Sequence, residues 1–285
     1  MTSPSPSPSP SSGPSPSSGP GPSSGPGPSP SPSPSPSSGT RRPHTLVTGG
    51  SRGIGAATAL RLARDGHDIA LSYVHDEGAA ARVADAVLAA GARCTVLRAD
   101  TSQEADVERM FDEAVDRIGP LTGLVNNAGV TSALGPLAEA STEDLRRVVD
   151  VNVLGVLLCC RRAARDMSAA GAGAIVNLSS AAATLGSPGD YVHYAASKAA
   201  VDTLTLGLAK ELGPAGVRVN AVAPGIIDTE IHAASGAPDR AAQAGPGIPL
   251  RRPGSADEVA AAIAWLLSDD AAYTTGTVVR VAGGR

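Results

Sequence analysis

The sequence is poor in cysteine, and its three cysteines do not form a recognisable pattern. Three is an odd number, and Cys159 and Cys160 are adjacent, with no C-x-x-C spacing anywhere. This argues against a disulfide framework and against a zinc site, so no metal is expected. The adjacent pair lies in an apolar run, where we expect small buried side chains rather than reactive thiols.

Long hydrophobic runs and an excess of positive charge are also missing. No stretch reaches the roughly 18 apolar residues of a membrane span, and the N-terminus lacks the charged-then-apolar order of a secretory signal. With 23 Lys+Arg against 27 Asp+Glu, the formal net charge is −4, which offers no basic stripe for nucleic acid. We expect a cytoplasmic protein with neither a membrane nor a nucleic-acid partner.

Residues 1–42 differ from the rest of the chain. They alternate Ser-Pro with Ser-Ser-Gly-Pro and leave nothing apolar to bury, which predicts a disordered tail. The tail is interpreted either as a docking or phosphorylation segment or as a dispensable linker or misassigned reading-frame start. Residues 43–285 are predicted to fold as one domain, since a chain of this length can bury a large core.

From His44 onward, short apolar runs alternate with longer amphipathic stretches. The runs predict strands at Thr45–Thr48, Asp68–Tyr73, Arg93–Arg98, Leu121–Asn126, Gly173–Ser179, Val217–Ala223 and Thr277–Val281. Helical spacing predicts helices at Ala56–Asp65, Glu77–Ala90, Glu104–Ile118, Thr142–Ala169, Tyr194–Leu212 and Ala256–Leu267. This alternation predicts an α/β fold of the Rossmann type, a doubly wound seven-stranded parallel sheet with helices on both faces. Ligands should bind at the carboxyl ends of its strands.

A glycine-rich turn directly follows the first predicted strand. Residues 48–55 read Thr-Gly-Gly-Ser-Arg-Gly-Ile-Gly, with the spacing T-G-x-x-x-G-x-G rather than G-x-G-x-x-G. Glycine allows the backbone to approach a pyrophosphate, and the free N–H groups of the next helix attract it. We expect a dinucleotide here, in contact with Gly49, Ser51, Arg52, Gly53, Ile54 and Gly55.

The end of the second strand bears on the choice between NAD and NADP. An acid about twenty residues further on would bind the ribose 2′-hydroxyl of NAD, but Leu71–Val74 contains none. Arg52 could instead face a 2′-phosphate, so NADP(H) is preferred and Tyr73 is assigned to the cofactor site. Asp76 and Glu77 could repel that phosphate, which leaves NAD(H) as an alternative.

Polar residues end three further strands. Asp100 ends the third strand and is placed to touch the adenine, or alternatively to cap the following helix. The sequence Asn-Asn-Ala-Gly at residues 126–129 ends the fourth, and Ser179 and Ser180 end the fifth. Because the carboxyl ends of parallel strands meet at one edge, these groups should lie beside the nucleotide or the substrate.

Tyr194 and Lys198 are four residues apart and therefore share one face of a predicted helix. A phenol ionises near pH ~10, and a neighbouring cation stabilises the phenolate, so the pair can exchange a proton near neutrality. Ser180, fourteen residues before the tyrosine, can hydrogen-bond the same substrate oxygen; Ser179 is the weaker alternative. Tyr191 has alanine four positions later and is set aside.

Taken together, these motifs resemble those of the single-domain short-chain dehydrogenase/reductase family. The chain matches its T-G-x-x-x-G-x-G at residues 48–55, its N-N-A-G at 126–129, its Y-x-x-x-K at 194–198 and its P-G segment at 224–225. The resemblance extends from about residue 43 to the C-terminus. One departure is the serine, which many relatives place one residue nearer to the tyrosine than Ser180.

The resemblance implies an NAD(P)-dependent oxidoreductase that interconverts a carbonyl and an alcohol by hydride transfer, with NADP(H) preferred on the residues named above. Tyr194 would be the general acid, Lys198 would lower its pKa and hold the nicotinamide ribose, and Ser180 would steady the substrate oxygen. Asn152 would complete a water-linked proton relay through Lys198. Further cofactor contacts would come from Asn126, Ala128, Gly129, Pro224, Gly225, Ile227 and Thr229.

Two other interpretations stay open. An NAD(P)-dependent sugar or polyol dehydrogenase would share every motif, whereas a nucleotide-sensing binding module usually lacks the tyrosine or the lysine. Relatives commonly pair through two long helices, here Thr142–Ala169 and Tyr194–Leu212, which implies a homotetramer or homodimer. Glu230–Leu250 should cover a small-molecule carbonyl or alcohol substrate, and His193 and His232 could touch it.

Overall fold

The computed structural model describes Gly13, residues 42–231 and residues 236–285. The predicted disordered tail therefore lies outside the described residues, apart from Gly13 and Arg42, and so does His232. Contacts group Arg41–Arg285 into one compact unit, and the domain boundary at residue 43 stays a prediction. Within the described ranges, no helix combines the length and the apolar character needed to cross a membrane.

The centre of the fold is a seven-stranded sheet in which every pair of neighbouring strands is parallel. Its strands are β1 His44–Val47, β2 Asp68–Tyr73, β3 Cys94–Arg98, β4 Gly123–Asn126, β5 Gly173–Leu178, β6 Val217–Pro224 and β7 Val278–Val281. Their order is β3-β2-β1-β4-β5-β6-β7, which reverses direction between β1 and β4 and places a crevice at the carboxyl ends of those two strands. The predicted doubly wound α/β fold is confirmed.

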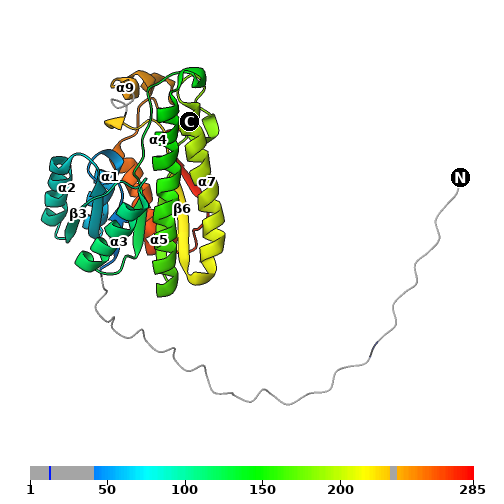
Figure 1. Ribbon diagram of the computed structural model, residues 1–285. Helices are drawn as coiled ribbons and strands as arrows, with labels where there is room; N and C mark the ends of the chain where they lie inside the picture. The colour runs from blue at the N-terminus through cyan, green and yellow to red at the C-terminus, as the bar shows by residue number, and fades with distance from the viewer. Residues whose placement is uncertain (1–12, 14–41, 232–235) are drawn as a thin grey trace, which may run out of the picture. The chain divides into compact units, whose positions relative to one another are not determined.

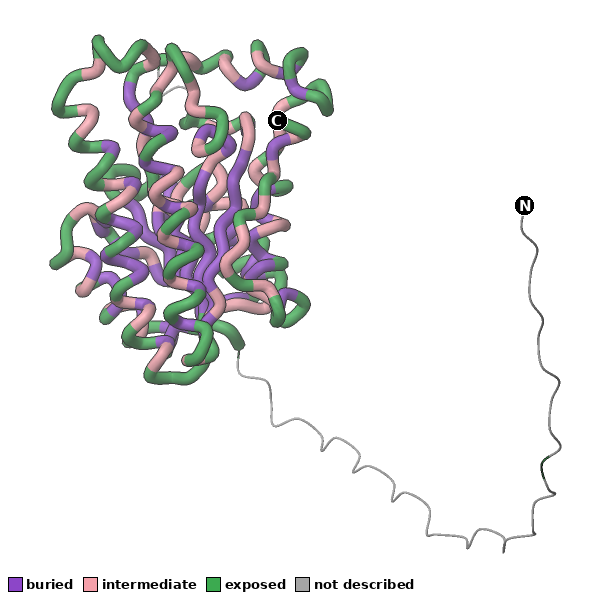
Figure 2. Tube along the Cα trace, turned by 90° about the vertical axis from the view of Figure 1, so that its right-hand side faces the viewer, coloured by how far each residue is buried: buried purple, intermediate pink, exposed green. Residues whose placement is uncertain are grey.

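Helices cover both faces of the sheet (Figure 1). One face carries α3 Glu104–Ile118, α5 Gly155–Ala170 and α7 Val192–Leu212, and the other carries α1 Gly53–Arg64, α2 Glu77–Ala89 and α10 Ala256–Leu267. Successive strand residues point to opposite faces, so Leu46 packs in the first core and Val47 in the second. Figure 2 shows the buried parts of the chain gathered in the strands between these helices.

Shorter elements complete the fold. Two of them, α4 Thr142–Val149 and the turn η2 Asp150–Leu154, lie within the helix predicted over Thr142–Ala169. The periodicity did not predict the others, which are α6 Ala182–Leu185, α9 Arg240–Ala244, η1 Leu137–Glu139, η3 Gly213–Ala215, η4 Gly245–Gly247 and η5 Asp269–Ala271. Several helices begin at a side-chain cap. Ser255 accepts from the backbone of Glu258 while the Glu258 carboxylate bonds back to Ser255, a pairing that fixes the start of α10.

The single long helix predicted over Thr142–Ala169 is wrong in one respect. The chain leaves α4, passes through the π-helical turn η2 and continues as α5. A π-helical turn widens the hydrogen-bond pattern by one residue and often marks a functional site. Apolar spacing alone does not reveal such a change, and the buried Asn152 lies within this turn.

Candidate functional site

The glycine turn between β1 and α1 lies in the crevice at the carboxyl edge of the sheet. Gly49 and Gly53 have φ values of +63° and +53°, a backbone conformation that favours glycine. A Cβ on Gly55 would lie 2.4 Å from the Gly49 carbonyl oxygen, and a Cβ on Gly50 would lie 2.7 Å from Cβ of Leu71. The turn is therefore a close-packed backbone cradle that larger side chains would fill.

The end of β2 supports one side of this cradle. The Gly49 N–H donates to Oγ of Ser72 at 3.2 Å, and the Gly50 N–H donates to the Ser72 carbonyl at 2.8 Å. Tyr73 follows and is buried in the core. The Asp76 carboxylate accepts a backbone N–H at the start of α2, so this acid is engaged as the cap of that helix.

The residue after β4 supports the other side. Asn127 donates from Nδ2 to the carbonyl oxygens of Thr48 and Gly49, both at 2.9 Å. The backbone N–H groups of Asn127 and Ala128 donate to Oγ1 of Thr48, both at 3.0 Å. Asn127 is not among the residues that the motifs assign to the cofactor. The doubled asparagine at a strand end was the available signal, but spacing does not show which of the two faces the turn.

The N-terminus of α1 opens onto the cradle. Arg52 occupies the N-cap position, and its exposed side chain forms no capping hydrogen bond. Thr229 lies opposite, because a Cβ on Gly53 would come within 3.4 Å of its Cγ2 atom. Ser51 and Ile54 are half-buried beside them. Helix N–H groups and a glycine cradle together fit the phosphates of a dinucleotide.

Tyr194, Ser180 and Lys198 come together at the neighbouring strand ends. The Tyr194 side chain is buried, and the Ser180 hydroxyl hydrogen-bonds its phenol. The Lys198 Nζ atom lies 5.7 Å from the centre of the Tyr194 ring and donates to the Leu178 carbonyl at 2.7 Å. Lys198 is thus held by the last residue of β5, next to the tyrosine.

Gly129 joins this group to the cradle. A Cβ on Gly129 would lie 3.5 Å from Nζ of Lys198 and 3.4 Å from Oδ1 of Asn152, and a Cβ on Gly49 would lie 3.0 Å from Cα of Ala128. The turn, the end of β4 and the Tyr194–Lys198 pair therefore form one continuous site. Tyr194 is therefore neither remote from the glycine turn nor turned into solvent, and either arrangement would have excluded a shared site.

Burial dominates the protonation of both groups. It raises the pKa of Tyr194 above its usual value, with the neighbouring Tyr191 adding to this and the Ser180 hydrogen bond opposing it. It lowers the pKa of Lys198 to about 8, against an opposing effect of Asp202. Lys198 was expected to lower the pKa of the tyrosine, but desolvation dominates and the pKa is raised. At neutral pH the phenol keeps its proton and the lysine is largely charged.

The two candidate serines have different environments. The Ser179 hydroxyl is buried, donates to the Lys198 carbonyl at 3.3 Å and lies beside Asp202. The Ser180 hydroxyl accepts from the Ala182 N–H at 3.1 Å and reaches Tyr194. The structure therefore places Ser180, and not Ser179, against the tyrosine.

Asn152 is locked in place behind the lysine. Its Oδ1 accepts from the Val130 N–H at 2.8 Å, and its Nδ2 donates to the Val130 carbonyl at 2.9 Å and to Oγ of Ser197 at 3.1 Å. These bonds tie the π-helical turn to the segment after β4 and to α7. The position suits the relay that the resemblance implies, and the relay itself stays a prediction.

Two predicted cofactor contacts have other partners. Asn126 is turned into the interior, where Nδ2 donates to Oδ1 of Asn177 at 2.8 Å and to Sγ of Cys160 at 3.2 Å. Asp100 accepts from the Ser102 N–H at 3.0 Å and the Ser102 hydroxyl at 2.8 Å. These contacts give both side chains a structural role. The side-chain amide of Asn126 in particular points into the interior and away from the crevice.

The segment after β6 approaches the cradle through Thr229. Pro224 ends β6, and a Cβ on Gly225 would lie 2.7 Å from Cα of Ala282. Gly225 is therefore required by packing against the C-terminal segment. Ile227 is buried and pairs with Gly254 in an isolated bridge, which anchors the backbone just before Thr229.

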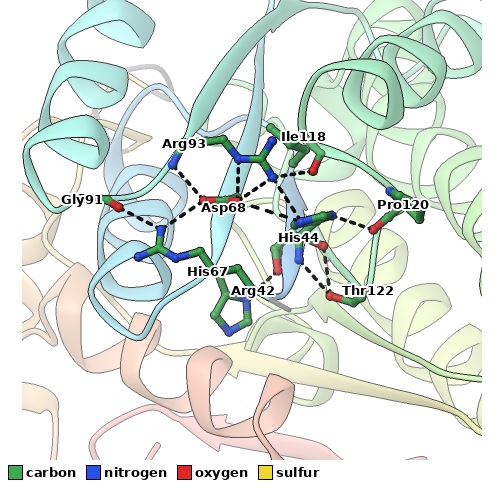
Figure 3. Close-up of polar contacts among 10 residues, drawn as sticks. Arg42, His44, His67, Asp68, Gly91, Arg93, Ile118, Pro120 and Thr122 are labelled. Carbon is green, nitrogen blue, oxygen red and sulfur yellow. Dashed lines mark hydrogen bonds and ion pairs between the residues drawn. The ribbon is translucent and has the colours of Figure 1, made fainter. Parts of the chain in front are cut away.

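Another polar cluster lies at the amino ends of the strands (Figure 3). Asp68 accepts from Nε of Arg93 at 2.8 Å and from Arg42 at 3.2 Å, and Nδ1 of His44 lies 3.0 Å from the Pro120 carbonyl oxygen. Burial raises the pKa of Asp68, but the arginine hydrogen bonds outweigh it and lower the pKa overall. These groups satisfy one another, so the cluster anchors β1 and β2. Across the described part of the chain, no group of His, Cys, Asp and Glu is suited to hold a metal.

The comparisons with known proteins agree with this geometry. A family model described as "Enoyl-(Acyl carrier protein) reductase" matches residues 49–285. The "Uncharacterized oxidoreductase YgfF" of Escherichia coli K12 is 49% identical over 243 residues, which cover 84% of this chain and 98% of that protein.

Two solved structures with bound nucleotide are also similar. An NAD+-bound xylitol dehydrogenase has a TM-score of 0.79 at 33% identity and covers 85% of this chain and 98% of its own. A short chain dehydrogenase from Burkholderia cenocepacia J2315 in complex with NADP has a TM-score of 0.78 at 36% identity, and the match covers 85% of this chain and 97% of that one. With these matches over the same fold and motifs, the chain belongs to the short-chain dehydrogenase/reductase family of NAD(P)-dependent oxidoreductases.

Proposed function

We propose that this protein is an NADP(H)-dependent reductase that converts a ketone or aldehyde to an alcohol with Tyr194 as the general acid. One observation carries the proposal, namely a buried phenol that is hydrogen-bonded to Ser180 and lies beside Lys198 at the glycine cradle. A nicotinamide cofactor, when bound at the cradle, would supply the hydride for the carbonyl carbon. The chain's own residues handle the proton and the oxygen.

Each polar group then has one task in reduction. Ser180 donates a hydrogen bond to the carbonyl oxygen and orients it toward the phenol. Tyr194 transfers its proton to that oxygen as the alcohol forms, and the Lys198 ammonium stabilises the resulting phenolate. Asn152, locked beside Lys198, would position the water that returns a proton to the tyrosine.

The preference for NADP(H) is supported by the charges around the cradle. Arg52 is an exposed cation at the start of α1, and Leu71–Tyr73 at the end of β2 includes no acid. The Asp76 carboxylate is engaged with the backbone of α2, which weakens its repulsion of a 2′-phosphate. The NADP complex of the Burkholderia relative supports this choice, and the NAD+ complex of the xylitol dehydrogenase supports the alternative.

A sugar or polyol dehydrogenase is the second candidate. The similar xylitol dehydrogenase favours it, and so do polar groups on the residue before Tyr194 and on the segment after β4. Nε2 of His193 lies 2.6 Å from the Ser132 hydroxyl, while Nδ1 of His193 and the hydroxyl of Thr131 are buried without hydrogen-bond partners among the described residues. A substrate with several hydroxyls could satisfy such groups.

We also propose a cytoplasmic homotetramer or homodimer. Val149, Leu154 and Leu157 are exposed apolar side chains along α4, η2 and α5, and Leu206 is exposed on α7, as expected of helices that pair with another subunit. The three cysteines are free, which suits a reducing compartment. Light scattering should give two or four times the chain mass, and a monomer at micromolar concentration would contradict the assembly.

A substrate and cofactor panel tests the proposed reaction. Aliphatic and aromatic ketones and aldehydes are incubated with NADPH and with NADH, sugars and polyols are incubated with NADP+ and with NAD+, and absorbance at the nicotinamide band is followed. We expect carbonyl reduction with NADPH as the better donor. Turnover of sugars or polyols alone would favour the second candidate. Nucleotide binding without any turnover would instead favour a nucleotide-sensing module.

A further inference from the structure

Arg240 connects α9 to the loop that precedes α7. Its NH2 atom lies 2.5 Å from Oδ2 of Asp190, and this ion pair is partly shielded from solvent. Burial alone would lower the pKa of Arg240, but Asp190 and Tyr191 raise it above its usual value. Because α9 has only five residues, too few for a stable isolated helix, its position depends on contacts such as this ion pair and the buried Ala241.

The same guanidinium group contacts Tyr191. Its Cζ atom lies 5.3 Å from the centre of the Tyr191 ring, and the group reaches the Tyr191 hydroxyl. Nε of Arg240 is buried without a hydrogen-bond partner in the described ranges, which costs free energy that the contacts with Asp190 and Tyr191 must offset. A planar cation held at an aromatic ring restrains that ring.

Tyr191 in turn contacts Tyr194. The two ring centres are 5.0 Å apart and the planes meet at 79°, an edge-to-face geometry that aromatic pairs prefer. The backbone behind Tyr191 is fixed, since the Gly135 N–H donates to the Asp190 carbonyl at 2.7 Å and the Ala195 N–H donates to the Tyr191 carbonyl at 3.1 Å. A line of contacts thus runs from α9 through Tyr191 to the tyrosine of the site.

We propose that Arg240 and Tyr191 are positioning residues for Tyr194. Arg240, anchored by Asp190, holds the Tyr191 ring against Tyr194 and so keeps the phenol of Tyr194 at Ser180. This inference rests on the proposed function, in which Tyr194 is the general acid. It assigns a role to the tyrosine that lacks a lysine partner and to an arginine fifty positions from Asp190.

Steady-state kinetics of matched variants tests this role. Arg240→Gln and Tyr191→Leu should each lower kcat about tenfold, the loss expected when one aromatic contact no longer orients the phenol. The dissociation constant for NADPH should stay unchanged, because neither residue contacts the cradle. Tyr191→Phe keeps the ring, so its kcat should fall much less. If Arg240→Gln folds poorly, Arg240→Lys replaces it, because the lysine keeps the ion pair with Asp190 but lacks the planar group that holds the Tyr191 ring. The double variant Arg240→Gln/Tyr191→Leu should be no slower than the worse single variant, since both changes break one line of contacts.

Arg251→Gln is the matched control. Arg251 is exposed in the same segment, and within the described residues its side chain donates only to a neighbouring carbonyl, that of Pro246, at 2.8 Å. Its substitution should leave kcat unchanged. Values of kcat within about twofold of wild type for Arg240→Gln and Tyr191→Leu, or losses that multiply in the double variant, would overturn the proposal.

A spectroscopic measurement separates this proposal from the proposed function. The chain has four tyrosines, so ring-labelled tyrosine gives a simple NMR spectrum in which Tyr194→Phe identifies the Tyr194 signal. Arg240→Gln should shift that signal, and Arg251→Gln should not. A wild-type protein without turnover in the substrate panel would refute the reductase, whereas an unmoved Tyr194 signal would refute the positioning role.

Discussion

Asn127 gives the most direct test of how the cofactor cradle is built. Its Nδ2 atom donates to the carbonyl oxygens of Thr48 and Gly49, both at 2.9 Å. Asn127→Ala removes both bonds, each of which contributes about 0.5–1.5 kcal/mol. We therefore expect a loss of about 2 kcal/mol in the free energy of unfolding, which corresponds to a melting temperature about 4–8 °C lower for a domain of this size.

Asn127→Asp distinguishes hydrogen bonding from volume. The carboxylate has nearly the same shape, but it places a negative oxygen against two carbonyl oxygens, so this variant should be less stable than Asn127→Ala. Differential scanning fluorimetry and NADPH titration are the assays, with exposed Gln243→Ala as the control. NADPH affinity should fall about tenfold as the turn loses its preset shape. Melting temperatures within about 1 °C of wild type and unchanged affinity would refute the reasoning.

Three other outcomes follow from the site. Gly55→Ala should abolish NADPH binding because its Cβ would meet the Gly49 carbonyl oxygen at 2.4 Å; calorimetry showing intact binding would refute the close packing. Arg52→Gln should weaken NADPH binding about tenfold or more and leave NADH unchanged; equal losses for both nucleotides would contradict the 2′-phosphate contact. Burial lowers the pKa of Lys198 to about 8, so its ammonium is lost as pH rises through that value. kcat/KM for reduction should therefore fall as the pH rises above about 8. A kcat/KM that does not change between pH 7 and pH 10 would refute the requirement for the cation.

Much of the fold could be predicted because its elements carry strong local patterns. β2 is fully buried around the apolar residues Ile69–Leu71, and α3 and α10 have clear helical spacing, so their predicted bounds match the structure. The π-helical turn around Asn152 was missed because its cause is a change in backbone hydrogen bonding within continuous apolar spacing.

The site was harder to predict wherever it depends on which way a side chain points. Consecutive residues at a strand end face opposite sides of the sheet. Asn126 therefore enters the core while Asn127 binds the turn, a distinction that the motif does not carry. The contact of Arg240 with Tyr191 joins segments far apart in sequence, and the raised pKa of Tyr194 comes from burial, which spacing cannot express.

The central claim is that the Tyr194 phenol donates the proton at an otherwise intact nucleotide site. The measurement is NADPH binding and carbonyl turnover for Tyr194→Phe beside the wild type, in the same buffer. We predict an unchanged dissociation constant and a kcat lowered by about 10²-fold or more, the usual contribution of a general acid. Turnover at the wild-type rate with NADPH bound would contradict the assignment of Tyr194 and the mechanism that depends on it.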